Sequence, residues 1–553
     1  MSLPSVVQAQ VDPAAVTKVT RLFNNTIGDV LAELIQNARR ADASRVTLQT
    51  TEAEHGVELS ICDDGIGIAD PAVLLALGKS GWDDTIARRE DPAGMGVFSL
   101  AGRHVTIRSR TRTAKTGWQI TVAAHAWEDG TPIPVAPCDQ PTGTEILLAL
   151  DKTWTNALDA AARSAARHCP IPVYLNGEEL KRVDWLEGAC AIHEEEGVRI
   201  GIFDDRRANA QSPSINFHGV TVSGGFPPIA EHQGSWCARV DIVDAPELQL
   251  VLPARKEMVE NDALSALRRA VRRAMYRYIA TRPSHRLAYA QYSEAARLGV
   301  ALPQAAALLT QWAPATADAH VGLSRAEIPA ADNLLIVEGS IPAIEQSAHL
   351  ALRADPAYAT RLVSPEPRMA GYRWYDQISR ITNLSFEIER DGETQLYSDE
   401  EFPGLESGPV DAVRLVLTIV ATAGVTATIV TAPAVIEYDD SACWGVEEAA
   451  VVIASTEAVT VEAIVDLLEG TCFSPSDERD ADSWETQHDR FLIDAREIAT
   501  SILHGDDAAL LERLRTVLAN RVQWFVPDGR QFRAVIARGE LSVALEPAST
   551  PEA

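Results

Sequence analysis

The sequence lacks the segments that mark an exported or membrane-spanning protein. No basic stretch leading into an apolar core follows Met1, and the most apolar run, residues 413–435, includes Thr, Gly and Arg414. That run alternates as buried strands do, whereas a membrane helix needs about 20 apolar residues in succession. We therefore expect a cytoplasmic protein without a membrane partner.

Cysteine pairs and positive charge are also scarce. The seven cysteines are scattered and never spaced as C-x-x-C, so we expect reduced thiols rather than a zinc site or a disulfide framework. The chain has 49 basic and 78 acidic residues and a net charge of −29. This argues against a surface devoted to nucleic acid, although a local basic patch is compatible with it. The 553 residues, 46% of them apolar, suffice for three or four packed domains.

A helix pattern over residues 26–41 contains the first candidate site. Glu33 and Asn37 are four residues apart and therefore lie on one side of the helix. A carboxylate beside a carboxamide suits a site that holds a metal and deprotonates a water, although ordinary polar helix faces carry the same pair. The apolar residues are spaced as one buried helix face: Ile27, Val30, Leu31, Leu34, Ile35 and Ala38.

A second pattern predicts a hairpin that ends in an acidic, glycine-rich loop. Residues 44–50 and 56–62 alternate as paired strands do, and the second leads into Asp63, Gly65 and Gly67 of a D-D-G-I-G segment. The glycines let the backbone approach a flat ligand, and the acid can accept a hydrogen bond from an exocyclic amine. D-x-G-x-G alone is also common in ordinary turns.

Residues 78–96 form a charged run bounded by glycines. Lys79 and Ser80 follow the first glycine, and Gly94, Met95 and Gly96 precede an apolar helix start. Backbone N–H groups at such a start can cradle a phosphate. The run suits a mobile lid or, equally, an ordinary surface loop. Further strands are expected near residues 104–110, 117–126 and 144–150, the last introduced by Gly143 and Thr144.

Taken in order, five motifs resemble those of the ATP-binding domain shared by gyrase B, the heat-shock-90 chaperones, histidine kinases and MutL, known as the GHKL group. They are E-L-I-x-N-A, D-x-G-x-G, K-S-G, G-x-G and G-T-x-I, and no G-x-x-x-x-G-K-[ST] phosphate loop occurs. The pattern is closest to the heat-shock-90-like branch. The resemblance implies a Bergerat-type α/β sandwich, with helices on one face of a mixed sheet. It also implies a slow ATPase with ATP and Mg²⁺ as ligands.

The resemblance further implies a role for each motif residue. Glu33 would be the general base that activates the attacking water, Asn37 would ligate Mg²⁺, and Asp63 would receive the adenine amino group. Two features depart from the family: Arg40 stands where several members carry an acid, and the loop at residues 94–99 differs from the usual G-x-x-G-x-G. The remaining nucleotide contacts would come from Gly65, Gly67, Lys79, Ser80, Gly94, Met95, Gly96 and Thr144.

A second region supports the resemblance. Residues 171–178 look like the strand and turn that follow the ATP domain, and residues 248–259 resemble the middle-domain loop of the chaperones. In that family a basic residue of this loop reaches the γ-phosphate, where the developing charge needs a cation. Lys256 fits best and Arg255 is the alternative, while a solvated basic residue before a helix would give the same pattern.

The helix expected at residues 262–278 is rich in arginine. A basic helix can lie on nucleic acid, or it can pair with the acidic surface of this protein or of a partner subunit. The buried stripe would be Leu264, Leu267, Val271, Met275 and Tyr278, and the arginines on other faces are Arg268, Arg269, Arg272, Arg273 and Arg277.

Beyond residue 282 the sequence shows no catalytic constellation. Residues 333–339 predict a buried strand ending in Glu-Gly, which faintly resembles the first strand of a Toprim metal domain. The candidate partner strand at 435–440 lacks the D-x-D spacing, so a structural strand–turn–helix unit is favoured. An amphipathic helix is expected at 495–517 and strands at 531–545.

Four domains are expected: an ATP-binding domain at 1–150, an α/β middle or transducer-like domain at 151–282, a helical and mixed linker domain at 283–405, and a C-terminal α/β domain at 406–553 for dimerisation or partner binding. The favoured function is an ATP-driven clamp of the heat-shock-90 type, a homodimer acting on a protein partner. The alternative is a DNA-associated ATPase of the MutL, topoisomerase or MORC type, including one within a defence system. A third option is a nucleotide-sensing scaffold that hardly hydrolyses ATP. A histidine kinase is not expected, because no dimerising histidine helix is seen before the ATP domain.

Overall fold

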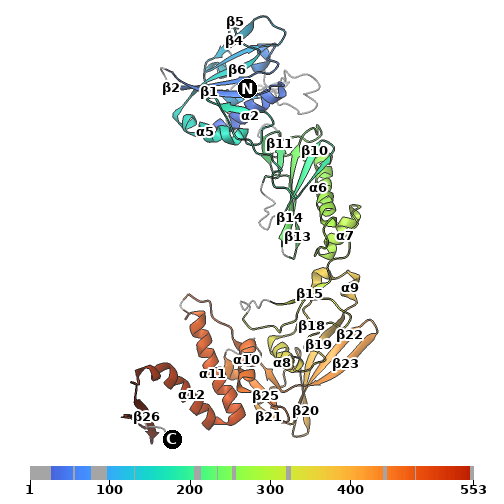
Figure 1. The fold of residues 1–553 in the computed structure, drawn as a ribbon, viewed down its shortest axis with the longest axis vertical. Helices are drawn as coiled ribbons and strands as arrows, with labels where there is room; N and C mark the ends of the chain where they lie inside the picture. The colour runs from blue at the N-terminus through green and yellow to red at the C-terminus, as the bar shows by residue number, and fades with distance from the viewer. Residues whose placement is uncertain are drawn as a thin grey trace, which may run out of the picture. The chain divides into compact units, whose positions relative to one another are not determined.

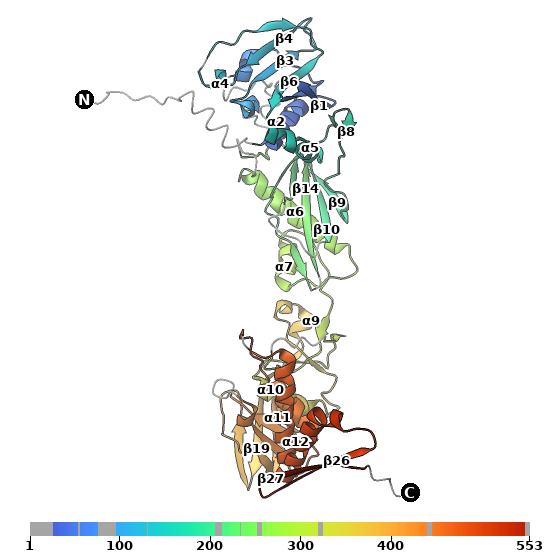
Figure 2. The same ribbon diagram turned by 90° about the vertical axis from the view of Figure 1, so that its left-hand side faces the viewer.

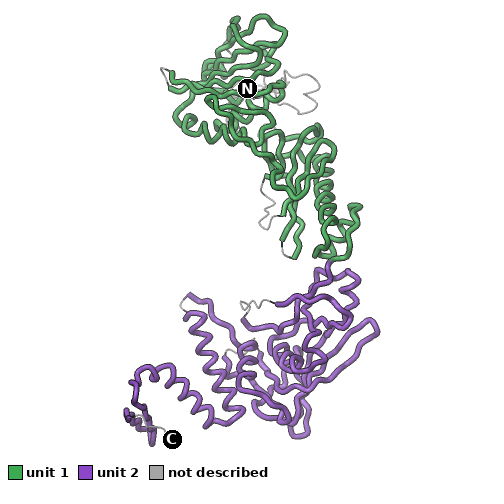
Figure 3. The backbone as a smooth tube through the Cα atoms, in the orientation of Figure 1, with its two compact units in different colours: residues 1–305 green, residues 306–553 purple. Residues whose placement is uncertain are grey.

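The computed structural model divides the chain into two units, residues 1–305 and 306–553 (Figure 3). It describes residues 26–53, 56–75, 96–129, 131–204, 213–232, 234–251, 257–318, 325–439, 445–479 and 481–547. The four expected domains stay a prediction. Unit 1 contains two hydrophobic cores, one over residues 27–180 and the other over residues 198–300.

The first core is organised around helix α2 (Ile27–Arg40). Thr26 begins the helix, because its Oγ1 accepts a hydrogen bond from the backbone N–H of Asp29 at 3.1 Å. The expected apolar stripe is buried along its whole length. Ala41 follows the last turn and donates its backbone N–H to Asn37 O at 2.9 Å. The helix predicted at residues 26–41 is therefore confirmed.

A mixed eight-stranded sheet packs against this helix in the order β5-β4-β3-β6-β2-β1-β7-β8. β1 and β2 form the predicted antiparallel hairpin, and β7 pairs with β1 in parallel. Helix α5 (Lys152–Ala166) packs beside α2 in the same core. The strands are β1 (Val46–Ala53), β2 (Gly56–Asp63), β3 (Val105–Arg110), β4 (Gly117–Val122), β5 (Ala136–Cys138), β6 (Gly143–Leu150), β7 (Val173–Leu175) and β8 (Glu178–Glu179).

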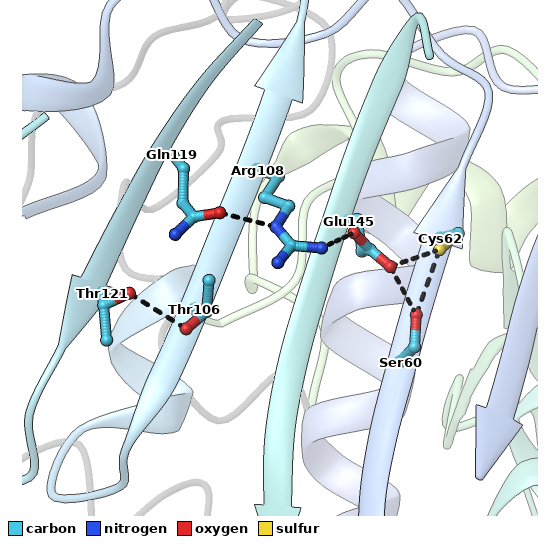
Figure 4. A network of polar contacts seen from close by, with 7 residues as sticks. All are labelled: Ser60, Cys62, Thr106, Arg108, Gln119, Thr121 and Glu145. Carbon is cyan, nitrogen blue, oxygen red and sulfur yellow. Dashed lines mark hydrogen bonds and ion pairs between the residues drawn. The ribbon is translucent and has the colours of Figure 1, made fainter. Parts of the chain in front are cut away.

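The opposite face of this sheet carries a polar network (Figure 4). Glu145 on β6 accepts hydrogen bonds from Arg108 Nη1 at 3.1 Å and from Ser60 Oγ at 3.0 Å. Arg108 also donates from Nε to Gln119 Oε1 at 2.7 Å. The alternation of each strand thus places apolar residues on the helix side and polar residues on the other, as expected of a sheet with one covered face. This arrangement confirms the predicted α/β sandwich.

The second core of unit 1 contains another sheet, ordered β12-β11-β14-β10-β9 with β13 paired to β14. Helix α6 (Asp262–Ala280) lies along β10 and β14 (Figures 1 and 2). Its predicted stripe is buried except for Tyr278, which is half-buried, while Tyr276 and Ile279 lie in the core. The other elements are β9 (Ala191–Glu195), β10 (Val198–Asp204), β11 (Ile215–Phe217), β12 (Val220–Val222), β13 (Ile229–Glu231), β14 (Gly234–Ile242) and α7 (Tyr289–Arg297).

Unit 2 has one sheet ordered β18-β17-β19-β22-β23, with β20 paired to β19, a second ordered β21-β25-β24, and the pair β15-β16. Helices α8 (Pro342–Leu352), α10 (Val461–Cys472) and α11 (Trp484–His504) pack with them. The strands are β15 (Leu308–Thr310), β16 (Glu327–Pro329), β17 (Leu335–Val337), β18 (Leu362–Val363), β19 (Ser379–Arg390), β20 (Glu393–Tyr397), β21 (Gly408–Val410), β22 (Ala412–Ala421), β23 (Gly424–Thr431), β24 (Ala434–Glu437) and β25 (Ala450–Ala454).

The two strands considered for a Toprim site lie in different sheets. β17 ends before Glu338, which accepts a hydrogen bond from Arg380 at 2.6 Å. The candidate partner strand is β24 (Ala434–Glu437) of the three-stranded sheet, and Asp440 lies outside the described residues. Among the described residues, no group of three or more His, Cys, Asp or Glu side chains is placed to hold a metal. The interpretation of the strand at 333–339 as structural stays a prediction.

The C-terminal segment departs from the expected single helix. Gly505, at φ +87°, separates α11 from α12 (Asp506–Arg521), because a left-handed residue cannot continue a helix. A short turn of helix, η5 (Gln523–Phe525), follows. The strands predicted at 531–545 are β26 (Arg530–Ala537) and β27 (Glu540–Pro547), which pair as an antiparallel hairpin. In the part of the chain that the structure describes, no helix is long and apolar enough to cross a membrane.

Candidate functional site

Glu33 and Asn37 meet a third side chain on α2, that of Arg40. Arg40 Nη1 donates a hydrogen bond to Asn37 Oδ1 at 3.1 Å and lies 4.0 Å from Glu33 Oε1. The Arg40 side chain is 4% exposed and that of Glu33 is 13% exposed, so both groups interact largely shielded from water. The residue that departs from the family pattern thus contacts both predicted site residues.

The same contact bears on magnesium binding. Carboxylate and carboxamide oxygens are ligands that suit Mg²⁺, so the donor atoms of Glu33 and Asn37 fit the ion. Asn37 Oδ1 is, however, bonded to the Arg40 guanidinium. Asn37 would have to exchange this bond for one to the metal, and Glu33 would lose part of the positive charge beside it.

Asp63 lies at the end of β2 on the side of the sheet that α2 covers. Strand alternation places it on the same face as the buried Leu59 and Ile61. Its Oδ1 accepts the backbone N–H of Gly65 at 2.9 Å. Burial raises the pKa of Asp63, while the backbone N–H groups of Gly65 and Thr144 oppose that shift. A half-buried acid facing the helix is compatible with the predicted adenine contact.

The glycine loop after Asp63 packs on the C-terminal end of α2. Ile66 donates its backbone N–H to Ala41 O at 2.8 Å, one turn beyond Asn37. A Cβ at Gly65 would lie 2.6 Å from Ala41 O, and a Cβ at Gly67, where φ is +73°, would lie 2.2 Å from Arg110 O. Both glycines are therefore required by contacts within the protein. Their approach to a nucleotide stays a prediction.

Ser109 on β3 is a residue of this region that the sequence analysis missed. It is fully buried, accepts the backbone N–H of Ile68 at 2.9 Å and donates to Gly143 O at 2.9 Å. Its Oγ also lies 3.0 Å from Oγ1 of Thr144, which pairs directly with Asp63 in the sheet. Ser109 thus joins the glycine loop to the G-T-x-I strand. The available signal was a serine at a buried position of an alternating strand.

The remaining predicted nucleotide contacts are described only in part. Gly96 begins a short 3₁₀ helix, η2 (Gly96–Leu100), that packs against α2. Leu250 and Met258 pair on either side of the expected cation loop. The predictions for Lys79, Ser80, Gly94, Met95, Arg255 and Lys256 fall outside the described residues, so their roles stay predictions.

Gln36, also missed, connects α2 to the second sheet. Its side chain is buried, and its Nε2 donates a hydrogen bond to His218 O in the turn between β11 and β12. His218 has φ +53°, and a Cβ added to Gly219 would lie 3.4 Å from Gln36 Nε2. The helix that carries Glu33 and Asn37 is therefore in direct contact with the second core of unit 1.

The arginines of α6 form ion pairs with carboxylates of the same unit. Arg268 binds Glu260 through both Nη atoms at 2.7 Å, and Arg272 binds Glu294. The hydrogen bond from Arg272 lowers the pKa of Glu294. Arg273 Nη1 lies 3.3 Å from Glu195 Oε1. These pairs match the expectation that the basic helix meets the protein's own acidic residues, and they leave nucleic-acid binding as a separate question.

The comparisons with known proteins agree with the motif order. Residues 25–143 match the family described as histidine kinase-, DNA gyrase B-, and HSP90-like ATPase. No curated protein matches the chain. Among solved structures, the chain is similar to the ATPase region of Saccharomyces cerevisiae topoisomerase II, with 9% identity, a TM-score of 0.33, and coverage of 46% of this chain and 89% of that one. Nothing here singles out the heat-shock-90-like branch. Residues 25–143, which contain α2, Asp63 and the glycine loop, are thus similar to the ATPase domain of the GHKL superfamily.

Proposed function

We propose that this protein binds Mg-ATP and hydrolyses it slowly as a conformational switch. The observation that carries the proposal is the position of α2. One helix presents Glu33 and Asn37, touches the Asp63 loop through Ala41, and touches the second core through Gln36. A change at the nucleotide can therefore reach the neighbouring sheet through directly packed groups.

Each residue has a defined task in this proposal. Glu33 accepts the proton of the attacking water, and Asp63 orients the adenine ring through its exocyclic amine. Asn37 holds the magnesium ion, which neutralises phosphate charge. Arg255 or Lys256 would supply a further cation to the phosphates from the second core.

Two classes of partner remain candidates. In the first, ATP closes a lid and joins two N-terminal domains of a homodimer, which clamps a protein partner in the manner of the heat-shock-90 chaperones. In the second, the switch acts on DNA, as in the MutL, topoisomerase and MORC ATPases. The arginine row of α6 motivates the second class, and gyrase B stands beside HSP90 in the family description.

The ATPase proposal is tested by comparing the wild type with Glu33→Ala. The variant should bind ATP with near wild-type affinity, measured by isothermal titration, and should lose phosphate release. A wild-type rate no higher than that of the variant would exclude hydrolysis and leave the nucleotide-sensing scaffold.

The partner class is tested by gel shifts on duplex DNA across a salt series. Arg269→Glu is the most informative variant, because Arg269 is exposed on α6. Substitution of Arg268, Arg272 or Arg273 would also break an ion pair with a glutamate. DNA binding that weakens with salt and with this variant supports the DNA-associated class. No shift at low salt removes it and favours a protein partner.

A further inference from the structure

A pocket of about 380 Å³ lies against helix α6 in the second core of unit 1. One side of α6, the loop between β12 and β13, and the end of α7 together line it. The volume falls within the ~300–1,000 Å³ of sites that bind small molecules. None of the lining residues belongs to residues 25–143, which resemble the ATPase domain.

One part of the pocket lining is apolar. Phe226 of the loop and Val271 of α6 are buried in the second core, and Leu298, directly after α7, is half-buried. Ligand sites are lined mainly by such side chains, because removing the apolar part of a ligand from water favours binding. The pocket therefore suits a ligand that has an apolar body.

The other part of the lining consists of three arginines of α6. Arg272 follows Arg268 by four residues and Arg269 by three. Residues three and four apart are neighbours on the surface of a helix, so Arg272 lies beside both of the others. Planar guanidinium groups suit carboxylate and phosphate groups, which they can bind through two parallel hydrogen bonds.

Arg268 is held in place by the loop and by a carboxylate. Its Nε donates a hydrogen bond to Gly224 O at 3.1 Å, and its two Nη atoms bind Glu260 at 2.7 Å. The neighbouring Gly225 has φ +64°, and a Cβ there would lie 3.3 Å from Arg268 Nη2. The loop thus packs closely on this guanidinium, whose charge Glu260 offsets.

Arg272 connects α6 to the other two walls of the pocket. It donates from Nε to Glu294 Oε1 of α7 at 3.0 Å and from Nη1 to Pro227 O of the loop at 3.3 Å. Its Nη2 binds Glu294 and Tyr276. Among the described residues, the second hydrogen of Nη1 has no acceptor. Because the side chain is already fixed, using this donor for a ligand costs little entropy.

Arg269 differs from both, because it is exposed and pairs with none of the residues that the structure describes. Glu260 and Glu294 offset the charges of Arg268 and Arg272, so Arg269 leaves the pocket with an excess of positive charge. The whole chain, in contrast, has a net charge of −29. A ligand with one anionic group would balance this excess. Nucleic acid needs a larger excess and has no use for the apolar lining.

We propose that this pocket binds a small organic anion, with a carboxylate or phosphate group held by Arg269 and Arg272 and an apolar body packed on Phe226 and Leu298. The ligand would contact α6, α7 and the loop together, and so would stabilise their arrangement. The proposal does not depend on the ATPase function, because every group it uses lies in the second core and binding needs no nucleotide.

The test uses isothermal titration of the full-length protein without nucleotide. The probes are phenyl phosphate and phenylacetate, which combine a ring with an anionic group, together with inorganic phosphate, which lacks the ring, and benzyl alcohol, which lacks the charge. Arg269→Ala removes the unpaired guanidinium and breaks no ion pair among the described residues. The matched control is Arg277→Ala, because Arg277 is exposed on the same helix but does not line the pocket. Circular dichroism verifies that both variants are folded.

At least one of the two ring-bearing anions should bind with a dissociation constant of about 1 mM or lower, as expected for a ligand of this size. The tighter of the two identifies the anionic group that the pocket prefers. Inorganic phosphate and benzyl alcohol should bind at least tenfold more weakly. Arg269→Ala should weaken binding about tenfold or more, whereas Arg277→Ala should leave it unchanged.

Four results would overturn the proposal. The first is that neither ring-bearing anion binds, and the second is that Arg269→Ala binds it as the wild type does. The third is an equal loss in Arg277→Ala, which would show a general effect of charge. The fourth is inorganic phosphate that binds as tightly as phenyl phosphate, which would show that the apolar lining contributes nothing. Duplex DNA that binds through Arg269 while both small anions fail would assign this arginine to nucleic acid instead.

Discussion

The N-terminal sheet and the C-terminal hairpin carry the same strand pattern with different outcomes. In β2 and β6 the apolar residues face α2 and α5 and are buried in one core. In β26 and β27 the apolar residues alternate just as regularly, yet they are exposed. Alternation therefore predicts that a face will be covered, but it does not reveal whether the cover comes from the same chain.

The largest expected effect is on the rate of ATP hydrolysis, when Glu33 is replaced on the helix that covers the N-terminal sheet. Removing the general base in Glu33→Ala should lower the rate of ATP hydrolysis by about 10²–10⁴-fold. Phosphate release measures this, with the exposed Glu52→Ala as the control. A variant that keeps more than half of the wild-type rate would contradict the role of Glu33.

Two side-chain substitutions compare the N-terminal core with the C-terminal hairpin directly. Leu31→Ala opens a cavity in a fully buried position of α2 and should lower the free energy of unfolding of the ATPase domain by about 2–5 kcal/mol. Val543→Ala also removes aliphatic side-chain atoms, but from an exposed position. It should lower the free energy of unfolding by less than about 1 kcal/mol in dilute, monomeric protein. Chemical denaturation measures both. Equal losses would show that the hairpin is already packed within the monomer.

Arg40→Ala should weaken the N-terminal domain while improving access to Asn37. Loss of the hydrogen bond to Asn37 and of the charge beside Glu33 should cost about 1–3 kcal/mol of stability. Because Asn37 Oδ1 no longer binds a guanidinium, less Mg²⁺ should be needed for half-maximal ATP binding. Arg45→Ala, on an exposed side chain, serves as the control. An unchanged magnesium requirement would show that Arg40 does not compete with the metal.

Asp63 should contribute to stability in a pH-dependent way. Because burial raises its folded pKa above the ordinary value of 3.8, the protonated form favours the folded state. That contribution is complete below pH 3.8 and is lost as the pH rises through the folded pKa. Asp63→Asn should therefore be more stable than the wild type at neutral pH and lose this advantage in acid. Its ATP affinity should fall about tenfold or more.

For Asp63 the measurements are denaturation across pH and isothermal titration with ATP. The Asp64→Asn variant separates the two acids, because the pKa of Asp64 is lowered by its hydrogen bonds to Ser44 and Arg45. That variant should instead lose stability at neutral pH. The proposed contact between Asp63 and adenine is contradicted if Asp63→Asn binds ATP with wild-type affinity.

The smallest expected effect concerns the contact between the two cores of unit 1. Gln36→Leu removes the hydrogen bond to His218 O and should cost about 1 kcal/mol of stability. ATP affinity should hold, whereas the hydrolysis rate should fall a few-fold, since α2 would no longer be tied to the second core. Single-turnover kinetics beside ATP titration separates these effects. A loss of affinity with an unchanged rate would contradict a coupling role.

Spacing was sufficient to predict where three candidate site residues lie, while their roles stay predictions. The 3.6-residue period placed Glu33 and Asn37 on one side of α2, and strand alternation led to Asp63 at the end of β2. Ser109 and Gln36 were missed because their partners, Gly143 and His218, are distant in sequence and become neighbours only through the tertiary fold. For Ser109 the visible signal was a polar residue at a buried strand position, whereas Gln36 lies off the apolar stripe of α2 and gave no such signal.

The C-terminal segment shows a different limit. The apolar stripe at 510–518 was expected to continue a helix from residue 495, but Gly505 separates the two helices and leaves that stripe exposed. A stripe that packs inside a domain and one that meets another molecule have the same spacing. Periodicity therefore identified the helix but not what its apolar side contacts.

The bond between Arg40 and Asn37 also has a consequence for the order in which ligands arrive. A guanidinium satisfies the carboxamide oxygen before any nucleotide is present, and Mg²⁺ gives up its hydration water reluctantly. Free magnesium is therefore a weak competitor for this oxygen. Under the proposed function, Arg40 would leave Asn37 Oδ1 when Mg-ATP binds and would then supply a positive charge close to the nucleotide.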